Sequence, residues 1–206
     1  MILYVEANFI LEYVFDQEEG TLVEQIVAHA ERGGCELCLP AVALFEPAYR
    51  VNGQIQKRKE LRERLDLELR HLARAQNPLL RGYGAAVEEA IRALNSANLT
   101  EQERLYRVLD RMSGVGRILG ITASTVRRAR RYQDEYDLSY PDAIVVASVV
   151  EDLEHHGSGG AFVCRDRLLT SSEVRTELES RRCVILTNFE RAAHFVLREP
   201  GAVEPA

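Results

Sequence analysis

Several large classes of protein are disfavoured by what the chain has little of. None of its apolar runs approaches the roughly 20 residues that a membrane-spanning helix needs. The start, MILYVEANFI, has neither the basic residues nor the cleavage site of a secretory leader. We therefore expect a cytoplasmic protein without a membrane partner.

Cysteine and histidine offer no obvious metal or redox site. Cys35 and Cys38 form a C-x-x-C pair, but a zinc site would need two further ligands at matching spacing, and Cys164 and Cys183 stand alone. We interpret all four as small apolar residues, kept reduced, in or beside strands. The histidines show no ligand spacing and no pairing with a serine or cysteine nucleophile, which favours surface or helix-end positions. They are His29, His71, His155, His156 and His194.

Charge is distributed unevenly along the chain. The net charge is −6, but residues 50–131 hold 18 Lys and Arg against 9 Asp and Glu, a balance of +9. The remainder has a balance of −15. Such asymmetry indicates a polyanionic partner for the basic part. The alternative is that these charges are the solvated faces of amphipathic helices.

Strand-like and helix-like segments alternate at both ends of the chain. We predict strands at 2–5, 36–39, 161–164 and 183–186, and helices at 8–14, 22–30, 41–51, 124–136, 139–155, 170–180 and 189–196. Asn8, Ser139 and Thr170 are the expected N-caps of three of these helices. The alternation predicts an α/β fold with a central, mostly parallel sheet flanked by helices on both faces.

The middle of the chain is charged and helical. We expect helices at 54–76, 85–94 and 100–112, the last opened by a capping box of Thr100 and Glu103. The predicted organisation is a single domain over 1–200, with 50–131 as a basic helical insertion and 201–206 as a loose tail.

Four carboxylates occupy positions from which they can meet at one edge of the sheet. Glu6 and Asp166 follow predicted strands, Asp142 lies in the first turn of a helix, and Glu46 lies in a helix that follows a strand. Ligands of parallel sheets bind at the carboxyl ends of the strands. Converging carboxylates repel one another and need a cation between them. Oxygen ligands without histidine or thiolate favour Mg²⁺ or Mn²⁺.

Each acid also has a purely structural interpretation. Asp142 suits a helix N-terminus capped by Ser139, Asp166 suits a loop, and Glu46 suits a solvated helix. Glu6 fits such an interpretation least well, because it follows directly on an apolar strand. The joint pattern is therefore the stronger argument.

At these four acids the chain resembles the PIN-domain family of Mg²⁺- or Mn²⁺-dependent nucleases, which includes the toxin nucleases of bacterial toxin–antitoxin pairs. The matching segments are YVEAN at 4–8, LPAVALFE at 39–46, YPDAIVVA at 140–147 and FVCRDRLL at 162–169. They cover parts of roughly 1–50 and 137–195. Three features depart from the family pattern: Glu6 replaces an aspartate, Cys164 replaces a small hydroxyl residue, and the middle is longer.

The resemblance implies a three-layer PIN-like fold and a metal-dependent endoribonuclease. Glu6, Asp142 and Asp166 would hold Mg²⁺ or Mn²⁺, Glu46 would complete the cluster or orient the water, and Asn8 would assist by hydrogen bonding. RNA would be the substrate. The resemblance also implies an antitoxin-like protein partner and pairing into a homodimer.

A cluster of arginines in the middle is a candidate RNA contact. Its members lie within one and a half turns of the predicted helix 124–136: Arg127, Arg128, Arg130 and Arg131. Arginines contact phosphates and stack on unpaired bases. The alternative is a helix that faces solvent or a protein partner.

Two other functions fit parts of the pattern. A PIN-fold protein that has lost catalysis would bind RNA or protein, and the substitution at Glu6 keeps this hypothesis open. A phosphatase with an acidic Mg²⁺ site would need an aspartate nucleophile after the first strand and a lysine. The first strand is followed by Glu6 instead, and lysine is limited to Lys57 and Lys59.

Overall fold

The computed structural model describes residues 1–74 and 76–197, and only the backbone of 78–82. The chain divides into two compact units. The sheet unit comprises Met1–Pro47 and the chain from Arg107 onward, and the hairpin unit comprises Ala48–Tyr106. The insertion expected over 50–131 is therefore shorter, because its last part belongs to the sheet unit. The tail expected over 201–206 lies outside the described residues.

The sheet unit contains five short strands and the helices between them. Its strands are β1 (Ile2–Val5), β2 (Glu36–Pro40), β3 (Arg117–Leu119), β4 (Gly160–Val163) and β5 (Cys183–Leu186). Its helices are α1 (Ala7–Val14), α2 (Gly20–Glu31), α5 (Ala123–Tyr136), α6 (Tyr140–His156), α7 (Ser172–Glu179) and α8 (Phe189–Leu197). Two longer helices, α3 (Ala41–Ala73) and α4 (Pro78–Val115), run across the boundary between the units.

All strand pairs of the sheet are parallel, in the order β3-β2-β1-β4-β5. This confirms the α/β class and the parallel sheet. The sequence did not indicate β3, which is an edge strand of three residues and too short to show periodicity. Gly116 precedes it because a side chain there would collide with Leu39 and with the carbonyl of Met112.

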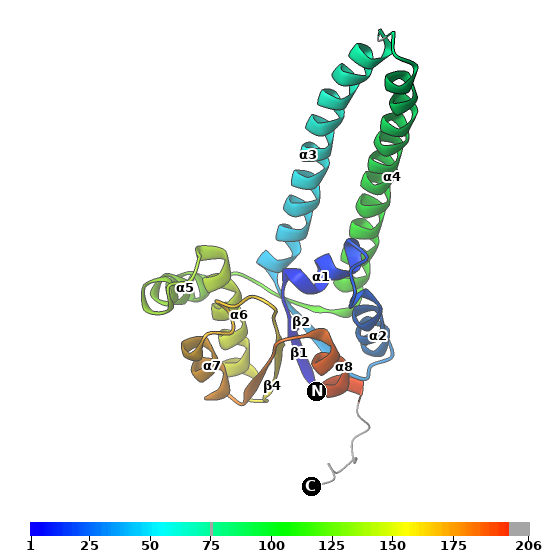
Figure 1. Cartoon of the computed structure of the whole chain (residues 1–206). Helices are drawn as coiled ribbons and strands as arrows, with labels where there is room; N and C mark the ends of the chain where they lie inside the picture. The colour runs from blue at the N-terminus through cyan, green and yellow to red at the C-terminus, as the bar shows by residue number, and fades with distance from the viewer. Residues whose placement is uncertain (75, 198–206) are drawn as a thin grey trace. The chain divides into compact units, whose positions relative to one another are not determined.

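Helices cover both faces of the sheet. In Figure 1, α5, α6 and α7 lie on one side of the sheet, and α1, α2 and α8 lie on the other. Strands β1 and β4 are buried along their whole length, which explains why they read as continuous apolar runs instead of alternating ones. All four cysteines are free and buried, as expected. No described helix is both long enough and apolar enough to cross a membrane.

Two of the expected N-caps are wrong by one or two residues. Glu6 caps α1 in place of Asn8, since its side chain accepts a hydrogen bond from the Asn8 backbone N–H. Ser171 caps α7 in place of Thr170. In both cases several adjacent polar residues suit the position, and the backbone conformation selects among them. Ser139 caps α6 as expected.

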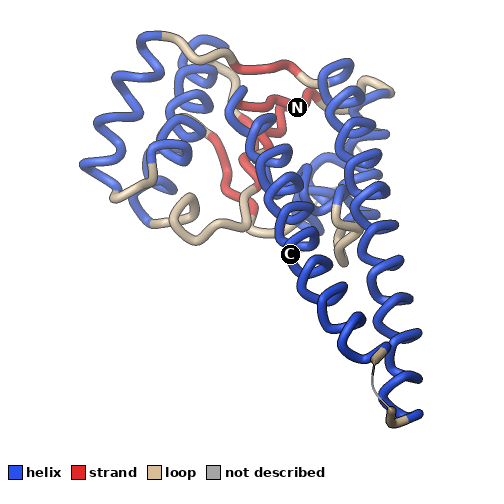
Figure 2. Tube along the Cα trace, turned by 90° about the horizontal axis from the view of Figure 1, so that it is seen from above, coloured by secondary structure: helices blue, strands red, loops and turns tan. Residues whose placement is uncertain are grey.

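The two long helices are simpler than the sequence indicated, because two expected breaks are absent. Helix α3 runs on through 52–53, and α4 runs on through 95–99. The Thr100 hydroxyl donates to the Ser96 carbonyl at 3.1 Å instead of capping a new helix. The two helices lie side by side (Figure 2). Arg58 ties them together through two bonds to the Glu101 carboxylate, at 2.7 and 2.8 Å.

A buried polar network joins α6 to two strands. Asp152 accepts hydrogen bonds from the Tyr4 hydroxyl at 2.8 Å and from the Arg117 guanidinium at 2.9 Å. Burial favours the neutral acid, but the bonds from Arg117 and Tyr4 outweigh it, so the pKa of Asp152 is lowered. The Asp152 carboxylate on α6 is thus hydrogen-bonded to side chains of both β1 and β3.

Replacing Tyr4 by Phe removes one neutral donor from this buried carboxylate. We expect the free energy of unfolding in urea to fall by about 1.5–3 kcal/mol, the usual range for a hydrogen bond to a charged group. Tyr49, which is 81% exposed, provides the matched control. Equal stabilities for Tyr4→Phe and Tyr49→Phe would contradict the structural role of the network.

Candidate functional site

Four carboxylates lie at the carboxyl edge of the sheet, all within the sheet unit. Glu6 follows directly on β1, and Asp166 comes three residues after β4, which pairs with β1. Glu46 lies in the second turn of α3, just after β2 on the other side of β1. Asp142 lies in the first turn of α6. Strand order therefore brings together acids that are up to 160 residues apart in sequence.

Burial and the neighbouring carboxylates together raise the pKa values of two of these acids. Burial raises the pKa of Glu6 from its ordinary value near 4.5 to about 7, and the charges of Glu46 and Asp166 add to the rise. Burial also raises the pKa of Asp142, again with contributions from Asp166 and Glu46. The same two neighbours therefore act on both acids, which makes the four carboxylates one electrostatic cluster.

Glu6 carries the most informative atom of the cluster. The residue is 5% exposed, and its Oε2 accepts the bond from the Asn8 backbone N–H at 2.8 Å. Its Oε1 is buried without any hydrogen-bond partner among the described residues. An unsatisfied buried acceptor costs about 1–3 kcal/mol. A cation bound beside Oε1 would remove that cost, so the donor set fits a hard divalent metal.

Local hydrogen bonds hold the other two expected ligands. The Ser139 hydroxyl donates to Asp142 Oδ2 at 2.5 Å, and the Leu168 backbone N–H donates to Asp166 Oδ1 at 2.7 Å. In the described part of the chain, no three Asp, Glu, His or Cys side chains stand in a group that could hold a metal ion as they are. Metal binding would therefore require these side chains to rotate toward one another.

Ion pairs and a backbone hydrogen bond hold the loop that carries Asp166. Arg165 forms an ion pair with the buried Glu12 at 2.8 Å and a second with Glu19 at 3.4 Å. Cys164 Sγ accepts a bond from the Asp166 backbone N–H at 3.3 Å. The thiol therefore supplies a hydrogen-bond acceptor to the backbone at Asp166. Sequence reasoning missed Arg165 and Glu12, because nothing in the sequence pairs residues so far apart.

The arginines of α5 differ from one another in their surroundings. Arg128 forms two bonds to the Glu154 carboxylate, at 2.8 and 2.6 Å. Glu154 is twelve residues beyond Asp142 on α6, about 18 Å along the helix. Arg131 lies over the ring of Tyr132, 5.7 Å from its centre. Arg127 and Arg130 are exposed. Arg128 is thus already committed within the fold, far from the carboxylates.

Much of the basic excess neutralises the acidic part of the sheet unit. Residues 107–131 hold seven Arg against one Asp, whereas the hairpin unit holds 11 Lys and Arg against 8 Asp and Glu. Three of these seven arginines form ion pairs with acids outside 107–131: Arg111, Arg117 and Arg128. For these three, the uneven charge reflects internal pairing and needs no polyanion.

Comparisons with known proteins do not assign the chain to a family. No model of a known protein family matches the chain, and no curated protein matches it.

The raised pKa of Glu6 predicts a pH-dependent stability. The folded protein binds this proton more tightly than the unfolded chain does, so stability is highest below about pH 4.5 and falls as the pH rises to about 7. Without divalent metal at pH 8, the free energy of unfolding in urea should therefore be higher for Glu6→Gln than for wild type, by about 1–3 kcal/mol. The difference should shrink toward pH 4.5.

The matched control is Glu190→Gln, a substitution of an exposed glutamate on α8. It should leave the pH profile unchanged. A wild-type profile that Glu6→Gln does not alter would contradict a raised pKa of Glu6 in the folded protein.

Proposed function

We propose that the protein is a Mg²⁺- or Mn²⁺-dependent endoribonuclease with a PIN-like fold. The observation that carries the proposal is a set of electrostatically coupled carboxylates at one edge of the sheet, among them Glu6 with its buried, unpartnered Oε1. Such a cluster is unfavourable by itself and becomes favourable with a hard cation. The parallel sheet flanked by helices on both faces is compatible with this class of nuclease.

In this proposal Glu6, Asp142 and Asp166 hold the metal. When bound, the metal supplies polarisation of a phosphodiester oxygen and activation of a water molecule. Glu46 lies at the same edge and orients the attacking water or completes the ligand set. Ser139 holds the Asp142 carboxylate by hydrogen bonding, and Arg165 fixes the loop that carries Asp166. The Asn8 side chain is a candidate donor to the RNA.

The proposal also includes two protein partners. An antitoxin-like protein would regulate a toxin-type nuclease, and a second copy would pair with it as a homodimer. The exposed large side chains of the hairpin unit provide apolar surface for such contacts; among them are Tyr49, Leu67, Tyr83, Leu99 and Tyr106.

One observation favours a second candidate, a PIN-fold RNA-binding module without catalysis. Oε2 of Glu6 is engaged in capping α1, and the glutamate is one methylene longer than the family's aspartate. If the capping bond is stronger than metal ligation, the site loses a ligand. Cleavage assays separate the two candidates.

The decisive assay is cleavage of a mixed RNA pool with Mg²⁺ or Mn²⁺. We expect metal-dependent cutting by wild type and a decrease of about 100-fold or more in Asp142→Asn, because the metal contributes several kcal/mol to transition-state stabilisation. Asp134→Asn, a substitution at an exposed position of α5, is the control and should cut normally. If folded wild type cuts in neither metal, the non-catalytic module becomes the better account.

RNA binding by α5 is tested separately from cleavage. Changing Arg127, Arg130 and Arg131 to Ala should weaken RNA binding and lower the slope of log affinity against log salt, by about 0.7 for each phosphate that the variant no longer neutralises. Arg128→Ala should mainly lower stability, since it breaks the Glu154 pair. An unchanged salt slope in the triple variant would refute the role of this helix.

A further inference from the structure

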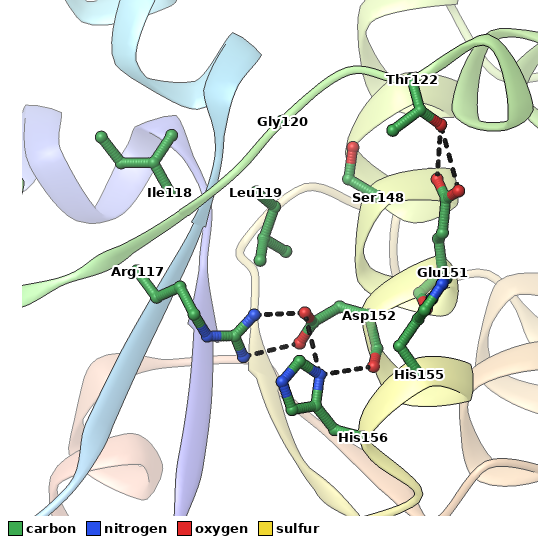
Figure 3. A pocket seen from close by; sticks show the side chains of 10 residues that line it. All are labelled: Arg117, Ile118, Leu119, Gly120, Thr122, Ser148, Glu151, Asp152, His155 and His156. Atoms are coloured by element: carbon green, nitrogen blue, oxygen red, sulfur yellow. Dashed lines mark hydrogen bonds and ion pairs between the residues drawn. The ribbon is translucent and has the colours of Figure 1, made fainter.

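A second polar site lies away from the four carboxylates. A cavity of about 340 Å³ opens between β3 with its following segment and the second half of α6 (Figure 3). The side chains that matter here are Ser148, Glu151, His155 and His156, with Arg117 and Thr122 opposite them. All belong to the sheet unit. The volume is in the range of small-molecule sites.

Ser148 presents an unsatisfied hydroxyl at this cavity. The residue is 3% exposed, and its Oγ has no hydrogen-bond partner among the described residues. A serine within a helix usually relieves its hydroxyl by bonding to the carbonyl four residues earlier. Ser148 is one of the residues that line the cavity, its Oγ is buried just beneath the cavity surface, and Figure 3 draws the hydroxyl without an interaction to any other lining residue. A ligand with a hydrogen-bonding group would remove the cost.

The two histidines present acceptors. His155 Nδ1 lies 2.7 Å from the Glu151 carbonyl oxygen, and His156 Nδ1 lies 3.1 Å from the Asp152 carbonyl oxygen. Because a carbonyl oxygen can only accept, each Nδ1 carries the hydrogen. His156 Nδ1 also lies 3.3 Å from Asp152 Oδ1. In each ring Nε2 is the nitrogen left for a ligand, and it accepts a hydrogen bond when the ring is unprotonated.

Among the described residues that line the cavity, the Glu151 carboxylate forms no ion pair. The Arg117 guanidinium is matched by Asp152 and Glu36. Glu151 receives hydrogen bonds from the hydroxyls of Thr122 and Thr125, which carry no charge. The cavity also lies at the carboxyl end of α6, where the helix dipole favours cations. The lining is therefore rich in acceptors and negative overall.

We propose that this cavity binds an organic cation with N–H donors, an ammonium or guanidinium group. Such a group pairs with Glu151, donates to Ser148 Oγ and donates to Nε2 of a histidine. The cavity is much larger than a bare metal ion, which leaves room for the carbon chain that carries the charge. Two sources share this chemistry: a free amine and a Lys or Arg side chain of a partner protein.

The test is titration of the full-length protein, followed by calorimetry and by NMR of backbone amides. The free probes are methylguanidinium and putrescine. The peptide probes are a short neutral peptide with one arginine and the same peptide with uncharged citrulline in its place. We expect the cations to bind and to shift amides of 117–122 and 148–156, and the citrulline peptide not to bind. Tighter binding of the arginine peptide than of methylguanidinium would identify a protein partner as the source.

Three variants decide whether the named residues make the site. Glu151→Gln should weaken cation binding by about 10- to 100-fold, as when a hydrogen bond to a charged group is removed. Ser148→Ala, which removes one unsatisfied atom, should weaken it by about 3- to 10-fold. Glu179→Gln, at an exposed position of α7, is the control and should bind as wild type.

Any of four results would overturn the proposal. The first three are no cation binding at millimolar concentrations, equal binding by Glu151→Gln and wild type, and amide shifts that lie outside the cavity. Binding that a metal chelator abolishes would also overturn it, because the ligand would then be a metal ion. None of these results depends on nuclease activity.

Discussion

An all-parallel sheet covered by helices on both faces leaves its strand ends as the main positions for polar side chains. Here β1 and β4 are buried throughout, so the first acid after each strand lies at the rim of the core. This constraint places Glu6 beside the apolar core and within the electrostatic field of Glu46 and Asp166. The raised pKa of Glu6 and its unpartnered oxygen are consequences of that position. The metal proposal follows from the same constraint.

Much of the fold was predictable, because buried parallel strands give continuous apolar runs and helices give periodic ones. Strands β1, β2, β4 and β5 were found in this way. The edge strand β3 has three residues and could not be. The breaks expected within α3 and α4 were wrong, since turn-forming residues such as Thr100 are tolerated inside a long helix when their side chains bond back to the preceding turn.

The candidate site was predictable to a similar extent. The four acids could be found because their positions relative to strands and helix starts are local features of the sequence. The contacts that hold these acids in place join residues far apart in sequence. The ion pair between Arg165 and Glu12, for example, could not be found from the sequence. The ion pair of Arg128 with Glu154 was likewise invisible in the sequence. The cavity beside Ser148 had no signal in the sequence, since one serine in an apolar helix is ordinary.

The central claim is that a divalent cation belongs among Glu6, Asp142 and Asp166. A crystal structure of the protein soaked in Mn²⁺, with anomalous diffraction data, tests it most directly. The account predicts an anomalous peak within coordination distance of Glu6 Oε1 and of at least one oxygen of each aspartate. A well-ordered cluster without such a peak, or with Mn²⁺ bound only elsewhere, would contradict the account.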